Sequence, residues 1–302
     1  MGRLNRLFKN EQFHYHLMLL PIFVLFTLFH VFPLYGIVLA FKSFIPTKGI
    51  LGSPWVGMMH YRFLLENPEV WHVLRNTLLI SVGKLITMLI VPIFLALMLN
   101  ELRIQWVKRS VQVITYLPHF LSWVILAGVF KDILSAQGVI NMILERVFGA
   151  EAISFLGSNF WFRPIMIISN VWKEMGFSTV IYLAALTSIN PALYEAAEID
   201  GASRFQRLWH ISIPGIAIVI ALLATLSLNG ILYAGFDQIY NLYNVLVYDT
   251  GDVIETWVFR NGLVGAQYEM GTAVGFINSL IGLSLIAITY TLAYRFANYR
   301  IF

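Results

Sequence analysis

Residues 190–214 read NPALYEAAEIDGASRFQRLWHISIP, a polar stretch that lies between two long apolar segments. Asn190 and Pro191 are typical of a helix start, because the asparagine side chain can accept from a free amide and proline presets φ. The residues that follow, LYEAAEID, have no helix-breaking residue. A first helix is therefore predicted to begin at Pro191 and to run to the next glycine.

Gly201 predicts the end of this first helix, because glycine adopts the left-handed conformation that stops many helices. Ser203 and Gln206 have the spacing of a capping box, in which each satisfies an amide of the other's turn. They predict the start of a second helix, and Ile211–Pro214 then leads into the next apolar segment. The whole stretch is predicted to form an elbow of two helices joined by a glycine turn.

The side chains of this elbow favour the docking of a soluble partner. Ala196 and Ala197 are small enough for a partner's backbone to approach closely, and Glu195, Glu198 and Asp200 supply charge for ion pairs. The alternative is an amphipathic helix lying on lipid headgroups, which is usually rich in Lys and Arg on its polar face. Because the first helix is acidic, we favour docking.

The composition indicates a membrane protein. Of 302 residues, 59% are hydrophobic and 12% are charged, whereas an ordinary soluble domain has about 25% charged residues. About 20 apolar residues cross the hydrocarbon layer as a helix. The predicted fold class is an all-α membrane protein with six transmembrane helices, at roughly 17–41, 72–99, 111–130, 164–188, 213–236 and 272–296.

The distribution of charge predicts the orientation of these spans. With both termini in the cytoplasm, the inner segments hold ten basic and five acidic residues, and the outer segments hold seven basic and ten acidic ones. Basic residues are enriched on the cytoplasmic side of membrane proteins. We therefore expect both termini and the elbow at 190–214 to be cytoplasmic.

Several function classes are excluded by the motifs that are missing from the sequence. Gly83-Lys84 lies inside a span and lacks the pattern of a phosphate-binding loop, and there is no zinc-binding H-E-x-x-H motif. The chain has no cysteine. Its basic residues flank apolar spans, which membrane topology explains better than nucleic-acid binding. We expect no catalytic residue, no metal and no cofactor in this chain.

Polar and aromatic residues within or next to the spans are candidates for lining a pathway. Ionisable groups in apolar sequence are costly and usually face the interior of a helix bundle. For Lys173 and Glu174, ion pairing between helices is an equal alternative, and neighbours about 100° apart on a helix need not pair with each other. For the aromatic residues, packing is the alternative. The predicted pathway residues are Trp172, Lys173, Glu174, Phe177, Tyr182, Asn229, Tyr233, Asp237 and Gln238.

One motif of the elbow resembles a known family. Glu195-Ala196-Ala197, three residues, Gly201, nine residues and Ile211-x-Ile213-Pro214 resembles the EAA loop of binding-protein-dependent ABC importer permeases. Ile213 departs from the leucine that this family usually has before the proline. Residues 172–203 and 234–263 are similar to the LplB-like, oligosaccharide-importing branch of the MalF/UgpA-like sugar permeases.

This resemblance implies a type I ABC importer (MetI-like) permease fold with a cytoplasmic coupling helix. It implies that residues 1–70 form a basic segment, a first span and an outer loop, and that 71–302 form the permease core. The elbow would be the EAA loop that docks an ATPase. The docking residues implied by the motif are Glu195, Ala196, Ala197, Asp200, Gly201, Ile211 and Pro214.

The resemblance also implies partners and a substrate class. The partners are a second, homologous permease subunit, two ATP-binding subunits that hold the ATP and Mg, and an extracytoplasmic solute-binding protein. The location is the cytoplasmic (inner) membrane of a bacterium. The substrates are oligosaccharides, including polyuronides such as alginate or pectin fragments in some members. Arg75, Lys84 and Lys173 outnumber Glu174 in the spans, which favours such acidic substrates.

Two other classes of membrane protein fit the sequence less well than an importer subunit. An ion-coupled secondary sugar transporter acting alone needs a relay of carboxylates in the membrane, and only Glu174 qualifies. A scaffold or sensor without transport is disfavoured, because no soluble signalling domain is evident in the sequence.

Overall fold

The computed structural model describes residues 11–297, in which all regular elements are helical apart from one antiparallel bridge between Lys42 and Trp55. The side chains close to both ends of this range and that of Asn229 lie outside the description. The helices and helical turns are α2 (Glu11–Phe26), η1 (Thr27–Val31), η2 (Phe32–Phe41), η3 (Pro46–Lys48), α3 (Gly49–Gly52), α4 (Met59–Glu66), α5 (Pro68–Glu101), α6 (Gln105–Tyr116), η4 (Leu117–Phe120), α7 (Trp123–Ile133), α8 (Val139–Phe148), α9 (Asn159–Thr187), α10 (Pro191–Ile199), α11 (Arg204–Arg207), η5 (Leu208–Ser212), α12 (Ile213–Gly215), α13 (Ala217–Ser227), η6 (Leu228–Gly230), α14 (Phe236–Leu242), η7 (Val245–Val247), α15 (Tyr248–Gly251), α16 (Ile254–Trp257), η8 (Val258–Val264) and α17 (Tyr268–Ala297).

The chain divides into two compact units. The first unit combines the chain up to Glu66 with Val258–Ile277, and the second combines Asn67–Trp257 with the chain from Asn278 onward. In the first unit, the ring of Phe41 stacks on Trp55 with centroids 5.6 Å apart. All residues discussed below as candidate sites belong to the second unit.

Three described helices are long and apolar enough to cross a membrane, at His14–Phe41, Pro68–Glu101 and Tyr268–Ile288. Three more spans are obtained if each of three bent helix pairs counts as one span. The predicted fold class is confirmed as all-helical with apolar spans, and six spans is the upper count. The three bent pairs are Gln105–Phe120 with Trp123–Ile133, Asn159–Thr187 with Pro191–Ile199, and Arg204–Gly215 with Ala217–Ser227.

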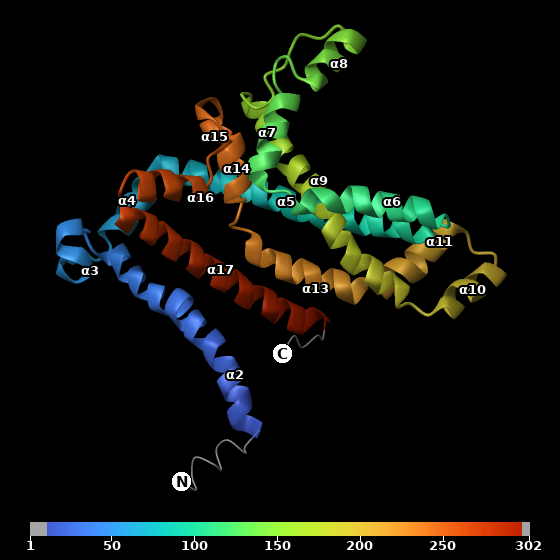
Figure 1. Cartoon of the computed structure of the whole chain (residues 1–302), viewed down its shortest axis with the longest axis horizontal. Helices are drawn as coiled ribbons and strands as arrows, with labels where there is room; N and C mark the ends of the chain where they lie inside the picture. The colour runs from blue at the N-terminus through green and yellow to red at the C-terminus, as the bar shows by residue number, and fades with distance from the viewer. Residues whose placement is uncertain (1–10, 298–302) are drawn as a thin grey trace. The chain divides into compact units, whose positions relative to one another are not determined.

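Helices α5 and α9 form the centre of the second unit and lie side by side (Figure 1). One buried cluster brings Ile80 of α5 and Phe162 of α9 together with apolar residues of α7 and α14, and all of its members are almost fully covered. A second cluster joins Tyr182 of α9 to Ala96 of α5 and Ile216. Burial of apolar side chains stabilises by about 25 cal/mol per Å², so these two clusters hold the surrounding short helices in place.

Two predicted spans are broken rather than continuous. The prediction of one helix over 111–130 is wrong, because η4 and α7 meet at Leu121–Ser122 and the two halves are bent by 107°. Pro118 lacks an amide donor for the preceding turn, and the Ser122 hydroxyl caps the new helix by accepting from the amide of Ile125. The predicted helix over 213–236 is bent by 58° at Ile216, and it ends before Gly235, which has φ of +96°.

A buried lysine from a neighbouring helix donates to a backbone carbonyl beside the break at Leu121–Ser122, and another does so beside the turn at Gly235. Lys173 Nζ of α9 donates to the carbonyl of His119 at 2.9 Å. Lys84 Nζ of α5 donates to the carbonyl of Ala234, directly before Gly235, and to Oε1 of Gln238. Their exposed fractions are only 7% and 8%. Carbonyls at helix ends have lost their amide partners, and a buried carbonyl needs a donor from elsewhere in the chain.

We therefore expect Lys84→Met to destabilise the protein, because the Ala234 carbonyl and the Gln238 side-chain oxygen would lose their donor inside the core. The expected loss is about 1–3 kcal/mol, visible as a lower apparent Tm of the protein purified in detergent. The matched control is Arg75→Met, which removes a cation from an exposed position of the same helix. Equal Tm values for both variants would show that Lys84 does not support the break.

Candidate functional site

The elbow at 190–214 has the local structure that its sequence predicts. The Asn190 side chain accepts from the amide of Ala192, and α10 begins at Pro191. Gly201 has φ of +75°, the left-handed value expected at the turn. Ser203 and Gln206 form the capping box of α11 through contacts of 3.3 and 2.7 Å. The prediction of two capped helices around a glycine turn is confirmed.

Side-chain contacts connect the two helices of the elbow to each other and to the next span. Arg207 pairs with Glu198 at 3.0 Å. The hydroxyls of Tyr194 and Ser212 are 3.0 Å apart, which joins α10 to the segment entering α12. These contacts join the two helices of the elbow to each other and to the segment that leads to Pro214.

One surface of the elbow is left open in this chain. Glu195, Ala196, Asp200, Gly201 and Pro214 are exposed, while Ala197 and Ile211 are half-buried. Large apolar side chains lie beside them without cover, and they are Leu193, Ile199, Phe205 and Trp209. Exposed apolar patches rimmed by polar groups are typical of surfaces that bind another protein or a membrane. The elbow thus combines internal rigidity with an uncovered apolar and acidic face.

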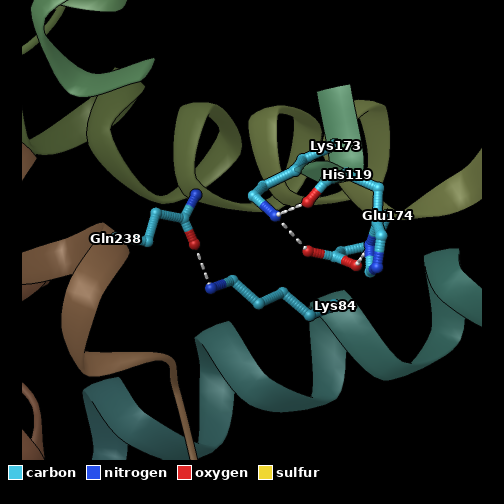
Figure 2. A network of polar contacts seen from close by, with 5 residues as sticks. All are labelled: Lys84, His119, Lys173, Glu174 and Gln238. Atoms are coloured by element: carbon cyan, nitrogen blue, oxygen red, sulfur yellow. Dashed lines mark hydrogen bonds and ion pairs between the residues drawn. The ribbon is translucent and has the colours of Figure 1, made fainter. Parts of the chain in front are cut away.

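A second candidate site is a polar cluster inside the second unit, formed by Lys173, Glu174 and His119 (Figure 2). Lys173 Nζ lies 2.9 Å from Glu174 Oε1, and Glu174 Oε2 lies 2.7 Å from His119 Nδ1. The His119 ring stacks on Phe177, with centroids 4.4 Å apart and an angle of 7° between the ring planes. Lys173 is buried, whereas the side chains of His119 and Glu174 are 28% and 29% exposed. The neighbours Lys173 and Glu174 do pair with each other here, and His119 completes the group.

Lys84 and Gln238 form a second, fully buried polar group next to this cluster (Figure 2). Gln238 also donates to the carbonyl of Met166 and to the hydroxyl of Ser169, both at 2.8 Å. Nearby, a Glu255 oxygen accepts from the amide of Gly235 at 3.2 Å. Burial raises the pKa of the Glu255 carboxyl, while amide hydrogen bonds and the charge of Lys84 oppose this rise. The group ties α5, α9 and α14 together.

The nine predicted pathway residues fall into two groups in the structure. Lys173, Tyr182 and Gln238 are buried at 7%, 2% and 1% exposure, and their side chains pack or bond inside the unit. The exposed or half-exposed residues are Trp172, Glu174, Phe177, Tyr233 and Asp237, and the side chain of Asn229 lies outside the described part. Trp172 borders an apolar hollow of about 510 Å³ between α7, α8 and α9, where its ring meets Phe130 edge-on.

Sequence reasoning missed His119, although a signal was present. His119 is an ionisable residue next to Pro118 in an otherwise apolar predicted span. Histidine is ionisable like lysine, arginine and glutamate, so a histidine in an apolar span is also expected to face the interior of the helix bundle. Its partner Glu174 is 55 residues away along the chain, so the pairing itself could not be predicted from spacing.

Comparison with known proteins agrees with this architecture. Residues 88–298 match the family model described as "Binding-protein-dependent transport system inner membrane component". The polygalacturonan/rhamnogalacturonan transport system permease protein YteP of Bacillus subtilis (strain 168) is 41% identical over 97% of this chain and 91% of its own length. The protein LplB of the same organism is 38% identical over 92% of this chain and 87% of its own length.

A solved structure is similar as well. A chain of a bacterial ABC transporter involved in the import of the acidic polysaccharide alginate matches with a TM-score of 0.88 and 40% identity, covering 98% of this chain and 99% of that one. These matches confirm the resemblance read from residues 195–214. This chain belongs to the binding-protein-dependent transport system inner membrane components, the non-enzymatic permease subunits of ABC importers.

Proposed function

We propose that this chain is the permease subunit of an ATP-driven importer that takes up oligosaccharides, and acidic ones in particular. The relative YteP is a transport system permease protein for polygalacturonan and rhamnogalacturonan, and the similar structure belongs to a transporter that imports alginate. All three are acidic polysaccharides. A second solved structure, similar with a TM-score of 0.86, holds that alginate transporter in complex with a pentasaccharide-bound periplasmic protein.

The partners follow from the same relationship. A second permease subunit, two ATP-binding subunits that hold ATP and Mg, and an extracytoplasmic solute-binding protein complete the machine. The chain lies in the bacterial cytoplasmic membrane with both termini in the cytoplasm, and residues 71–302 form the core that contains the family match at 88–298. The basic N-terminal residues and the last five residues lie outside the described range.

The observation that carries the proposal is the uncovered elbow at 190–214. Its two helices are capped, joined by the Arg207–Glu198 pair and linked to the next span, while Leu193 and Ile199 are 53% and 87% exposed. Burying such side chains against an ATPase would stabilise the assembly. When the ATPase dimer closes, α10 as the coupling helix moves with it and tilts the span that begins near Pro214. Alternating access of the pathway results.

The described contacts disfavour the ion-coupled transporter. Glu174 is the one acidic residue placed within the predicted spans, and its two oxygens are bound by Lys173 and His119 at 2.9 and 2.7 Å. Both oxygens of this carboxylate are therefore occupied by side chains of the chain itself, and a relay would need further carboxylates in the spans.

We expect ATP-dependent uptake of an acidic oligosaccharide when the chain is reconstituted in proteoliposomes with its partner subunits and binding protein. Trigalacturonate is a suitable probe, with hydrolysis-deficient ATPase subunits as the control. Uptake that persists with those inactive ATPases and follows a proton or sodium gradient instead would refute the importer assignment.

Gly201→Val is expected to abolish coupling between the ATPases and transport. Valine is strained at φ of +75°, so the angle between α10 and α11 would change. Both uptake and the ATPase activity stimulated by the binding protein should fall. The matched control is Gly201→Asn, because asparagine tolerates the left-handed conformation and should retain most activity. Normal uptake by the valine variant, at normal expression, would remove the elbow from the mechanism.

A further inference from the structure

We infer that His119 binds a carboxylate of the acidic oligosaccharide during transport, with its Nε2 as the donor and Glu174 and Phe177 holding the ring in place. This inference rests on the proposed function and names one residue that would select acidic substrates. His119 belongs to the polar cluster with Lys173 and Glu174 and is not among the predicted pathway residues.

The imidazole is held from several sides. Nδ1 lies 2.7 Å from Glu174 Oε2, and one ring face stacks on Phe177 at 4.4 Å. Phe120 meets the ring nearly at a right angle, with centroids 5.4 Å apart. The backbone carbonyl of His119 accepts from Lys173 Nζ. A side chain fixed in this way loses little conformational freedom when it binds a ligand.

The contact with Glu174 decides which nitrogen is available. Because a carboxylate only accepts, Nδ1 must carry the proton that it shares with Glu174. Nε2 is left for another partner, and no bond to it is present among the described residues. In a neutral ring Nε2 accepts, and in a protonated ring it donates. A carboxylate ligand only accepts, so it is bound when Nε2 carries a hydrogen, while Nδ1 on the opposite side of the ring donates to Glu174.

The two lysines nearby do not offer their charge to a ligand. Lys173 and Lys84 are 7% and 8% exposed and donate to backbone carbonyls and side-chain oxygens of the unit. The ammonium of Lys173 is also paired with Glu174 at 2.9 Å. The hypothesis that these lysines recognise acidic substrates is thus replaced by one in which they build the site and His119 makes the contact.

The exposure of the cluster indicates that it faces water. His119 and Glu174 are each a little over one quarter exposed in this chain. An ion pair on a transmembrane segment does not face hydrocarbon, and such groups line a water-filled cavity or contact another protein. We place the exposed edge of His119 on the pathway. A contact with the second permease subunit is the alternative outcome of the test.

The first experiment compares a charged ligand with its uncharged methyl ester. Binding of free trigalacturonate and of its methyl ester to the assembled transporter is measured without binding protein, so the selectivity of that protein does not enter. We expect the wild type to prefer the acid, and His119→Gln to reduce this preference about tenfold. His72→Gln, an exposed histidine at the start of α5, should leave it unchanged. A wild type without preference, or an undiminished preference in His119→Gln, overturns the inference.

The second experiment locates the side chain, and it uses the absence of cysteine from this chain. In the assembled transporter, Cys introduced by His119→Cys should react with a charged, membrane-impermeant thiol reagent, and saturating trigalacturonate should slow this reaction. Ile168→Cys, at a 67% exposed position that lines the apolar hollow, is the reference for a site that should react poorly. If position 119 does not react, or reacts equally fast with the sugar present, His119 does not lie on the substrate's path.

These results separate the inference from the proposed function. If the wild type imports trigalacturonate with ATP while His119 fails both tests, only the role of His119 is lost. If the wild type shows no ATP-dependent import of any acidic oligosaccharide, the proposed function fails first.

Discussion

The structure of the second unit depends on how backbone carbonyls are satisfied where helices end inside its buried interior. At two such places, after η4 and before α14, a carbonyl accepts from a buried lysine of another helix. Because a buried carbonyl without a donor is costly, each lysine stabilises an arrangement that a continuous helix would not need. Lys84 comes from α5 and Lys173 from α9, so the two central helices support the chain at both places.

The same two lysines determine how the remaining charges are arranged. Lys173 also pairs with Glu174, which in turn orients His119, so a residue that supports a helix break also sets the direction of an imidazole. Lys84 orders Gln238, whose amide reaches the backbone of α9. The lysine that supports a helix end and the polar cluster of Glu174 and His119 are therefore continuous in this unit. Lys84 and Lys173, which the sequence suggested as contacts for an acidic substrate, bind carbonyls and side chains of the chain itself.

The elbow could be predicted from the sequence because its determinants are local. Asn190, Gly201, Ser203 and Gln206 each act within three residues of their own position, and all four behave as their residue types predict. The broken spans could not be predicted in the same way. Hydropathy detects that a segment is apolar, whereas a bend of 107° depends on partners more than 50 residues away, such as Lys173 for the carbonyl of His119. For the same reason, the burial of Tyr182 and Gln238 follows from packing that spacing does not encode.

The residues that are tolerated at position 235 depend on the residue at position 84. The ammonium of Lys84 lies 3.2 Å from the point that a Cβ on Gly235 would occupy, and the backbone there has φ of +96°. A shorter side chain at position 84 would relieve this tight approach but leave the backbone angle, which still favours glycine. In this family we expect Lys84 to be replaced before Gly235 is. A homologue with a side chain at the position of Gly235 is expected to have a different backbone conformation throughout this turn.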